Sequence, residues 1–137
     1  MTVLPSPGTF EASVVVPSYN DGSTLRGCLE ALALQSVRDR LQVVVSVDGG
    51  EPLSDELSSM ADVVVEGPHM GPAAARNRGF RLSAGRYVLF TDSDCRPDPS
   101  WAEVMLEGLR SGADGVKGAY SGGGGGIIQR LAQLDGL

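Results

Sequence analysis

The stretch Leu41-Gln-Val-Val-Val-Ser-Val-Asp-Gly-Gly50 decides the fold of this chain. It begins as a nearly continuous run of β-branched residues and ends in an Asp-Gly-Gly turn, which predicts a strand over 41–47. Strands that are apolar at almost every position are typical of parallel sheets with both faces covered. Two more runs of this kind, Ala12-Ser-Val-Val-Val-Pro17 and Ala61-Asp-Val-Val-Val65, predict neighbouring strands.

Helical patterns separate the strands. After the first strand, apolar residues at helical spacing run from Leu25 to Ala33. Gly71-Pro72 predicts the start of another helix, because proline suits a first helical turn. Start and stop signals in the sequence place that helix over 71–84. They also predict a fourth strand over 86–91, a helix over 99–109 and a short strand over 114–119. This alternation predicts an α/β fold, a mostly parallel sheet flanked by helices.

The length of 137 residues fits one domain. We expect its core to span residues 12–119. Five consecutive glycines follow Ser121, and glycine costs entropy to order, so a flexible loop is predicted over 121–126. Ile127, Ile128, Leu131 and Leu134 then favour a short amphipathic helix within a tail over 127–137.

Charge and cysteine content exclude several classes of protein. The net charge of −6 argues against nonspecific binding of nucleic acid and of anionic lipid. Cys28 and Cys95 form no Cys-x-x-Cys pair, so neither a zinc site nor a disulfide framework is predicted. Residues 1–10 lack the features of a signal peptide, and no apolar run is long enough for a membrane span. We therefore expect a cytoplasmic protein, with peripheral attachment to the inner face of a membrane left open.

The fourth strand leads into two carboxylates, Asp92 and Asp94. Residues i and i+2 of an extended segment point to the same side, so both could face one ligand. Mg²⁺ and Mn²⁺ prefer oxygen ligands, and one or two carboxylates usually hold them beside substrate phosphates. A solvated pair is the usual reading of Asp-x-Asp taken alone, so the context has to support a metal site.

That context comes from the ends of the other strands. Ser18-Tyr-Asn20 follows the first strand, Asp48-Gly-Gly50 the second and Asp92-Ser-Asp94 the fourth. Parallel strands end at the same edge of a sheet, where ligands bind in open α/β folds. The three segments should therefore converge on one site.

Four motifs resemble those of the family 2 glycosyltransferases in order and spacing. They cover Ser13 to Trp101 and are Ser13-Val-Val-Val-Pro-Ser-Tyr-Asn20, Gly71-Pro-Ala-Ala-Ala-Arg-Asn-Arg-Gly79, Ala84-Gly-Arg-Tyr-Val-Leu-Phe90 and Thr91-Asp-Ser-Asp-Cys-Arg-Pro-Asp-Pro-Ser-Trp101. The resemblance implies the Rossmann-like GT-A fold. It also implies metal-dependent transfer of a sugar, with inversion, from a nucleoside diphosphate to an acceptor hydroxyl.

The resemblance also implies roles for single residues. Tyr19 would pack against the base, and Asp48 would accept a hydrogen bond from it. The family usually has two adjacent aspartates where this chain has Val47-Asp48. The implied nucleotide-sugar site comprises Pro17, Ser18, Tyr19, Asn20, Asp48, Arg76, Asn77, Asp92 and Ser93, and the implied metal ligands for Mn²⁺ or Mg²⁺ are Asp92 and Asp94.

Helix geometry bears on the residues of the Arg76-Asn-Arg78 segment. A guanidinium could offset the charge of a diphosphate, and an amide could bond the surrounding loops. Neighbouring residues of a helix differ by about 100°, so Arg76 and Asn77 are favoured for the pocket and Arg78 is interpreted as a solvated surface residue. His69, with no acidic or cysteine neighbour in sequence, is interpreted as an exposed loop residue.

The family places its catalytic base and acceptor motifs in a second half that this chain scarcely has, so that half is expected to be missing or reduced. No catalytic base is assigned. An active transferase and a truncated donor-binding half domain without turnover both remain open. A third reading is a phosphatase of the haloacid dehalogenase type, which also has Asp-x-Asp after a strand. A UDP-sugar is the first expectation for the donor. The acceptor, a saccharide or a lipid, is unknown, and a homo-oligomer is left open.

Overall fold

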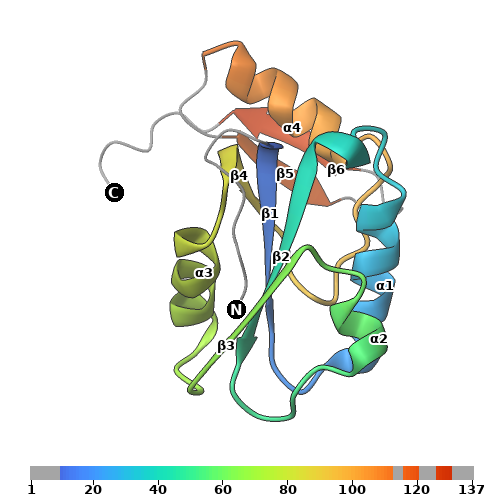
Figure 1. The fold of residues 1–137 in the computed structure, drawn as a ribbon. Coiled ribbons are helices and arrows are strands. Elements are labelled where there is room, and N and C mark those ends of the chain that lie inside the picture. Colours follow the sequence, from blue (N-terminus) through green and yellow to red (C-terminus); the bar gives the residue numbers. More distant parts are fainter. Residues whose placement is uncertain (1–9, 113–115, 121–125, 131–137) are drawn as a thin grey trace.

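The computed structural model describes residues 10–112, 116–120 and 126–130. Its centre is a four-stranded sheet in which every pair of neighbouring strands is parallel (Figure 1). The strand order is β3-β2-β1-β4. The strands are β1 (Phe10–Ser18), β2 (Leu41–Asp48), β3 (Val63–Gly67) and β4 (Gly85–Phe90).

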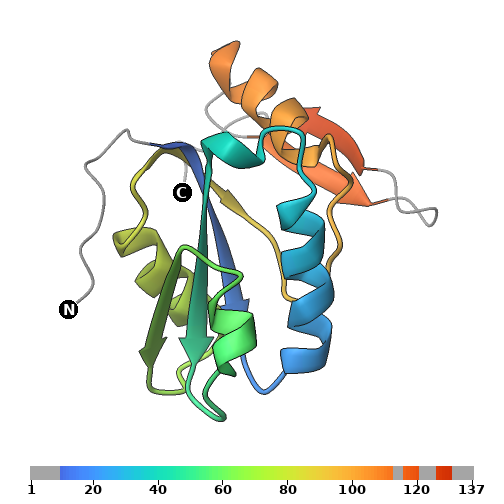
Figure 2. The same ribbon diagram turned by 45° about the vertical axis from the view of Figure 1, so that its right-hand side comes forward.

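Helices cover both faces of the sheet, as Figures 1 and 2 show. α3 lies on one face, and α1, α2 and α4 lie on the other. The helices are α1 (Gly22–Ala33), α2 (Asp55–Ser58), α3 (Pro72–Arg81) and α4 (Trp101–Arg110), with one 3₁₀ turn, η1 (Arg38–Arg40). Among the helices of the described ranges, none combines the length and the apolar character needed to cross a membrane.

The alternation of side chains along the strands explains the two covered faces. In β1, Val14 and Val16 belong to the larger core, which α1 and α4 complete, whereas Val15 belongs to a smaller core on the opposite face. All three are fully buried, and burying one valine contributes about 1.5–3 kcal/mol. On the α3 side the packing is close, because a Cβ on Gly79 would lie 2.6 Å from Val15 Cγ1. The apolar runs of the sequence are thus strands that are buried on both sides.

The predicted fold is confirmed, with shifted boundaries. The predicted strands and helices over 12–109 all form, and the strand predicted over 114–119 is β5 (Val116–Tyr120). α3 ends at Arg81, not near Ala84, and β3 begins at Val63, not at Ala61. The short α2 and η1 were not predicted, because one turn of helix carries too little periodicity to be recognised.

The helix predicted in the tail is wrong for residues 127–130. They lie in β6 (Gly126–Arg130), which pairs antiparallel with β5. Two consecutive β-branched residues, Ile127 and Ile128, favour an extended backbone, and β5 supplies the pairing partner. The predicted glycine loop lies outside the described residues except for Gly126, as does the tail over 131–137.

Candidate functional site

A hollow of about 240 Å³ lies at the carboxyl ends of the strands. Its walls come from the loops after β1, β2 and β4 and from the segment that leads into α3, so the predicted convergence of these loops is confirmed. The lining residues are Pro17, Ser18, Tyr19, Asp21, Asp48, His69, Pro72, Asp92 and Ser93. Six of the predicted site residues are therefore in one place.

Asp21, which the sequence reading missed, joins two walls of the hollow. Its carboxylate accepts a hydrogen bond from Ser18 Oγ at 2.5 Å and a second from Ser93 Oγ. An aspartate directly before a helix normally signals a cap, yet this side chain makes no capping bond to α1. The side chain instead ties the loop after β1 to the loop after β4.

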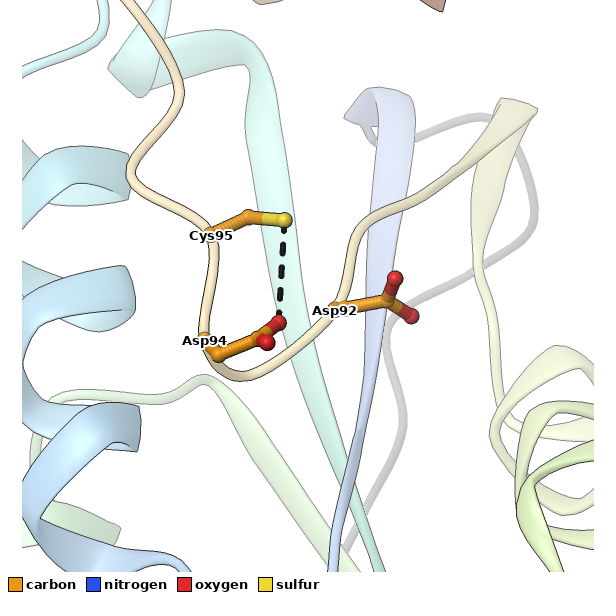
Figure 3. Close-up of side chains that lie close together, drawn as sticks. All are labelled: Asp92, Asp94 and Cys95. Atoms are coloured by element: carbon orange, nitrogen blue, oxygen red, sulfur yellow. Dashed lines mark hydrogen bonds between the residues drawn. The ribbon is translucent and has the colours of Figure 1, made fainter. Parts of the chain in front are cut away.

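The acidic pair after β4 is brought together by a turn. The strand ends at Phe90, and the Cys95 amide donates to the carbonyl of Asp92 at 3.0 Å. The prediction that both carboxylates share one side of an extended strand was therefore wrong in its geometry. One ligand atom each of Asp92, Asp94 and Cys95 nevertheless lies within 4.8 Å of the others (Figure 3).

The donor set of this turn fits a hard cation. Asp92 and Asp94 are exposed and offer carboxylate oxygens, which Mg²⁺ and Mn²⁺ prefer. Cys95 Sγ donates toward Asp94 Oδ1 at 3.8 Å. A thiol that acts as a donor is a poor ligand for these cations. The two carboxylates are thus the ligands that this turn can offer, with Cys95 beside them.

The far end of the same loop is anchored by a buried glutamine. Gln35 Nε2 donates to the Asp98 carbonyl at 2.7 Å, and Gln35 Oε1 accepts from the Ala102 amide at 2.9 Å. Ser36 N also donates to the Pro99 carbonyl at 2.9 Å. These bonds fix the segment between the acidic turn and α4 to the end of α1.

The two arginines of α3 have different partners. Arg76 Nη2 lies 3.1 Å from Asp92 Oδ1, which places a positive charge at the edge of the hollow. Arg78 donates to the carbonyls of Val47 at 3.2 Å and Pro68 at 3.3 Å, so its interpretation as a solvated residue was wrong. Asn77 is exposed and is not among the residues that line the hollow.

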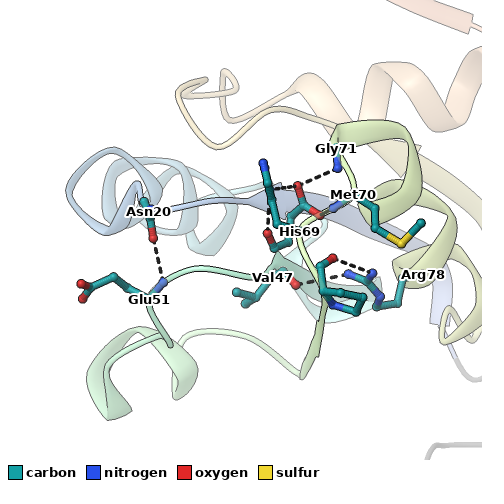
Figure 4. A network of polar contacts seen from close by, with 9 residues as sticks. Asn20, Val47, Glu51, His69, Met70, Gly71 and Arg78 are labelled. Carbon is teal, nitrogen blue, oxygen red and sulfur yellow. Dashed lines mark hydrogen bonds and ion pairs between the residues drawn. The ribbon is translucent and has the colours of Figure 1, made fainter.

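Asp48 is the centre of a polar network, and its partners His69, Met70 and Gly71 are labelled in Figure 4. The residue is only 3% exposed, and its carboxylate accepts from Met70 N at 2.8 Å, Gly71 N at 3.0 Å and His69 Nδ1 at 2.9 Å. The Met70 amide first, then the Gly71 amide and His69, hold the pKa of Asp48 below its ordinary value against the opposing effect of burial. His69 therefore has an acidic partner that its sequence neighbours did not reveal.

This network predicts a stability that depends on pH. A carboxylate with a lowered pKa in the folded state stabilises the protein above its unfolded value of 3.8, and the contribution is lost as the pH falls through the lower folded value. We expect Asp48→Asn to lower the Tm at pH 7, with a difference from wild type that shrinks as the pH falls below about 4. Thermal unfolding of both proteins from pH 7 to below about 4 measures this difference in Tm. Asp39→Asn, at an exposed position, is the control that should follow the wild type.

Two residues after β1 shape the opposite wall. The ring of Tyr19 stacks on that of His69, with centroids 4.1 Å apart and planes at 21°. Asn20 has a φ of 48°, a left-handed conformation that asparagine tolerates, and its Oδ1 accepts from Glu51 N at 2.7 Å. Asn20 thus holds the loop after β2, and Tyr19 has one face already covered.

The two cysteines should differ in reactivity. Cys28 is fully buried in the core, and burial is the main effect that raises its pKa to about 12. Cys95 is partly exposed, and both are free thiols. A thiol-specific reagent should modify one cysteine in the native protein and two after denaturation. Rapid modification of both cysteines in the native state would contradict this expectation.

Comparisons with known proteins agree with this architecture. The sequence profile of the family "Glycosyl transferase family 2" matches residues 13–132. Glycosyltransferase AglE of Haloferax volcanii is 32% identical over 99 residues, which are 66% of this chain and 33% of the relative. Pre-mycofactocin glycosyltransferase of Mycobacterium tuberculosis is 35% identical over 105 residues, 73% of this chain and 21% of the relative. The chain spans about a third or less of the length of such relatives.

Solved structures share the fold. TarS 1-349 of S. aureus, in complex with UDP-GlcNAc, has a TM-score of 0.66 at 24% identity and aligns with 74% of this chain and 32% of its own. The mannosyltransferase PcManGT of Pyrobaculum calidifontis, in complex with GDP-Man and Mn²⁺, has a TM-score of 0.58 at 25% identity. The match covers 81% of this chain and 35% of PcManGT. With a family profile that covers most of its length and a GT-A sheet that matches these enzymes, the chain belongs to the family 2 glycosyltransferases.

Proposed function

We propose that this chain binds a nucleoside-diphosphate sugar together with Mn²⁺ or Mg²⁺, and that it serves transfer of the sugar to an acceptor hydroxyl with inversion. One observation carries the proposal: Asp92 lines the hollow and also belongs to the acidic turn. A nucleotide in the hollow would therefore have its diphosphate close to the cation. The family membership of the chain supports the same reading.

The ligands of the cation would be Asp92 and Asp94. When bound, a divalent cation stabilises the negative charge that grows on a diphosphate leaving group. Arg76 offers a second positive charge beside Asp92 and can turn its guanidinium toward a phosphate. Pro17, Ser18, Tyr19, Asp48 and Ser93 would surround the nucleoside, and Asn20 would act by holding the loop after β2.

Two similar proteins bind nucleotide sugars, which supports a donor of this class. PcManGT binds GDP-Man with Mn²⁺, and TarS binds UDP-GlcNAc. Uridine is our first choice for this chain and guanosine the second. A role of Asn77 in the pocket stays a prediction from the sequence. The same holds for a cytoplasmic location and for a saccharide or lipid as the acceptor.

A second candidate is a donor-binding unit that does not turn over by itself. It is favoured by the share of the relatives that this chain covers, which is 33% of AglE. We assign no catalytic base to the residues described, and removal of the acceptor proton requires one. Sugar transfer by this polypeptide alone would exclude this candidate.

Calorimetric titration with UDP, GDP and TDP, each with and without Mn²⁺, tests the proposal. We expect one diphosphate to bind in the presence of the cation and to bind much more weakly without it. Transfer to water or to a simple acceptor then separates the active transferase from the donor-binding unit. Failure of all three diphosphates to bind with Mn²⁺ would overturn the proposal.

A further inference from the structure

Asp48 has little capacity left for a ligand. Oδ1 accepts from Met70 N, while Oδ2 accepts from both Gly71 N and His69 Nδ1. The side chain is nearly inaccessible to solvent. Its carboxylate is therefore engaged in shaping the segment before α3, and a nucleobase in the hollow would meet His69 before it met Asp48.

The hydrogen bonds of His69 fix which of its ring nitrogens carries the proton. Nδ1 lies 2.9 Å from Asp48 Oδ2 and 3.1 Å from the carbonyl oxygen of Asp48. Both of these atoms are acceptors, so Nδ1 must donate. In a neutral imidazole the other nitrogen, Nε2, is then an acceptor with a free lone pair.

The position of the ring directs this acceptor to the hollow. His69 lines the hollow, its side chain is 56% exposed, and the stack on Tyr19 restrains the plane of the ring. Among the described residues, no hydrogen-bond partner is found for Nε2. In Figure 4 one ring nitrogen faces the carboxylate and the other points away from the network.

We propose that His69, not Asp48, reads the edge of the nucleobase, and that Nε2 accepts a hydrogen bond from a ring N–H of the base. Uracil offers such a group at N3, and guanine offers one at N1. Cytosine presents a lone pair at N3, which would face the lone pair of Nε2, so it is disfavoured. Asp48 is a positioning residue that sets the tautomer. This inference rests on the proposed binding of a nucleoside diphosphate.

Methylated nucleotides test the inference directly. We would titrate the chain with UDP and with 3-methyluridine diphosphate, in Mn²⁺ and at mildly alkaline pH. GDP with 1-methylguanosine diphosphate is the parallel pair. The native chain should prefer the unmethylated nucleotide by about tenfold or more, because the methyl group removes the donor.

Two variants of His69 distinguish a hydrogen bond to the base from the packing of the ring on Tyr19. His69→Phe keeps an aromatic ring against Tyr19 but has no acceptor, so it should bind both nucleotides equally while keeping its dependence on Mn²⁺. His69→Gln restores a neutral acceptor and should recover part of the preference. If His69→Phe keeps the full preference, or if the native chain has none, the role of His69 is overturned while the proposed function stands. Absence of binding by every diphosphate overturns both.

A measurement on the native protein avoids any folding defect of the variants. His69 is the only histidine of the chain, so its ring nitrogens can be assigned without ambiguity in long-range ¹H–¹⁵N spectra. Protonated Nδ1 and unprotonated Nε2 are expected before nucleotide is added. UDP should shift the Nε2 resonance, and 3-methyluridine diphosphate should leave it unchanged. A proton found on Nε2, or an Nε2 resonance that UDP does not move, contradicts the inference.

Discussion

Asp94→Asn is expected to abolish the metal-dependent part of nucleotide binding and to weaken the affinity for the diphosphate by about a hundredfold. The substitution removes one of the two carboxylates in the acidic turn and leaves the contact between Arg76 and Asp92 in place. An amide is a much weaker ligand for Mn²⁺ than a carboxylate. Calorimetric titration of the variant with the preferred diphosphate, with and without Mn²⁺, gives the result.

The matched control is Asp39→Asn. Asp39 lies in η1, before the start of β2 and thus at the opposite end of the sheet from the hollow. The control loses the same charge, so it reports any general effect of net charge on nucleotide affinity. Equal affinity of Asp94→Asn and the native chain in Mn²⁺ would show that the cation is held elsewhere.

Gly85→Ala is expected to destabilise the fold by about 3 kcal/mol, which lowers the Tm by roughly 10–15 °C. A Cβ on Gly85 would overlap the backbone of Ala12 and Ser13 in the neighbouring strand β1. Backbone atoms of a paired central strand cannot move aside as a flexible side chain can. Thermal unfolding of the variant measures the loss.

Gly22→Ala serves as the control for this substitution. Gly22 begins α1, and an added Cβ would meet only Leu57 Cδ1 at 3.4 Å, an ordinary contact. Alanine is a better helix former than glycine by about 1 kcal/mol in a helix interior and less at its first residue. The control should therefore match or exceed the native Tm. A similar Tm for Gly85→Ala and Gly22→Ala would contradict the close approach of β4 to β1.

The loops that form the site were predictable because each follows a recognisable strand. The valine runs of β1 and β2 identify the strands, and parallel strands end at one edge. The sequence alone thus places Asp48 and Asp92 at the edge of the sheet where the hollow lies. The apolar pattern of each strand was sufficient to locate these loops.

The contacts between those loops were not predictable. His69 is 21 residues from Asp48, and Ser93 is 72 residues from Asp21. Such bonds depend on the exact path of each loop, including Asn20 at φ 48° and Gly71 at φ 100°. Residue type limits these conformations but does not select them. The partners of Asp21 and His69 could not be predicted for this reason.

The sequence by itself determined the α/β class, the parallel strands, the buried faces and the edge at which the polar residues gather. Each of these follows from the pattern of apolar residues within one short segment. Only the tertiary structure decided that a turn, not an extended strand, unites Asp92 and Asp94, that residues 127–130 pair as a strand, and that Asp48 holds His69. These features are pairings between groups, and a pairing exists only once the fold has brought both partners to the same place.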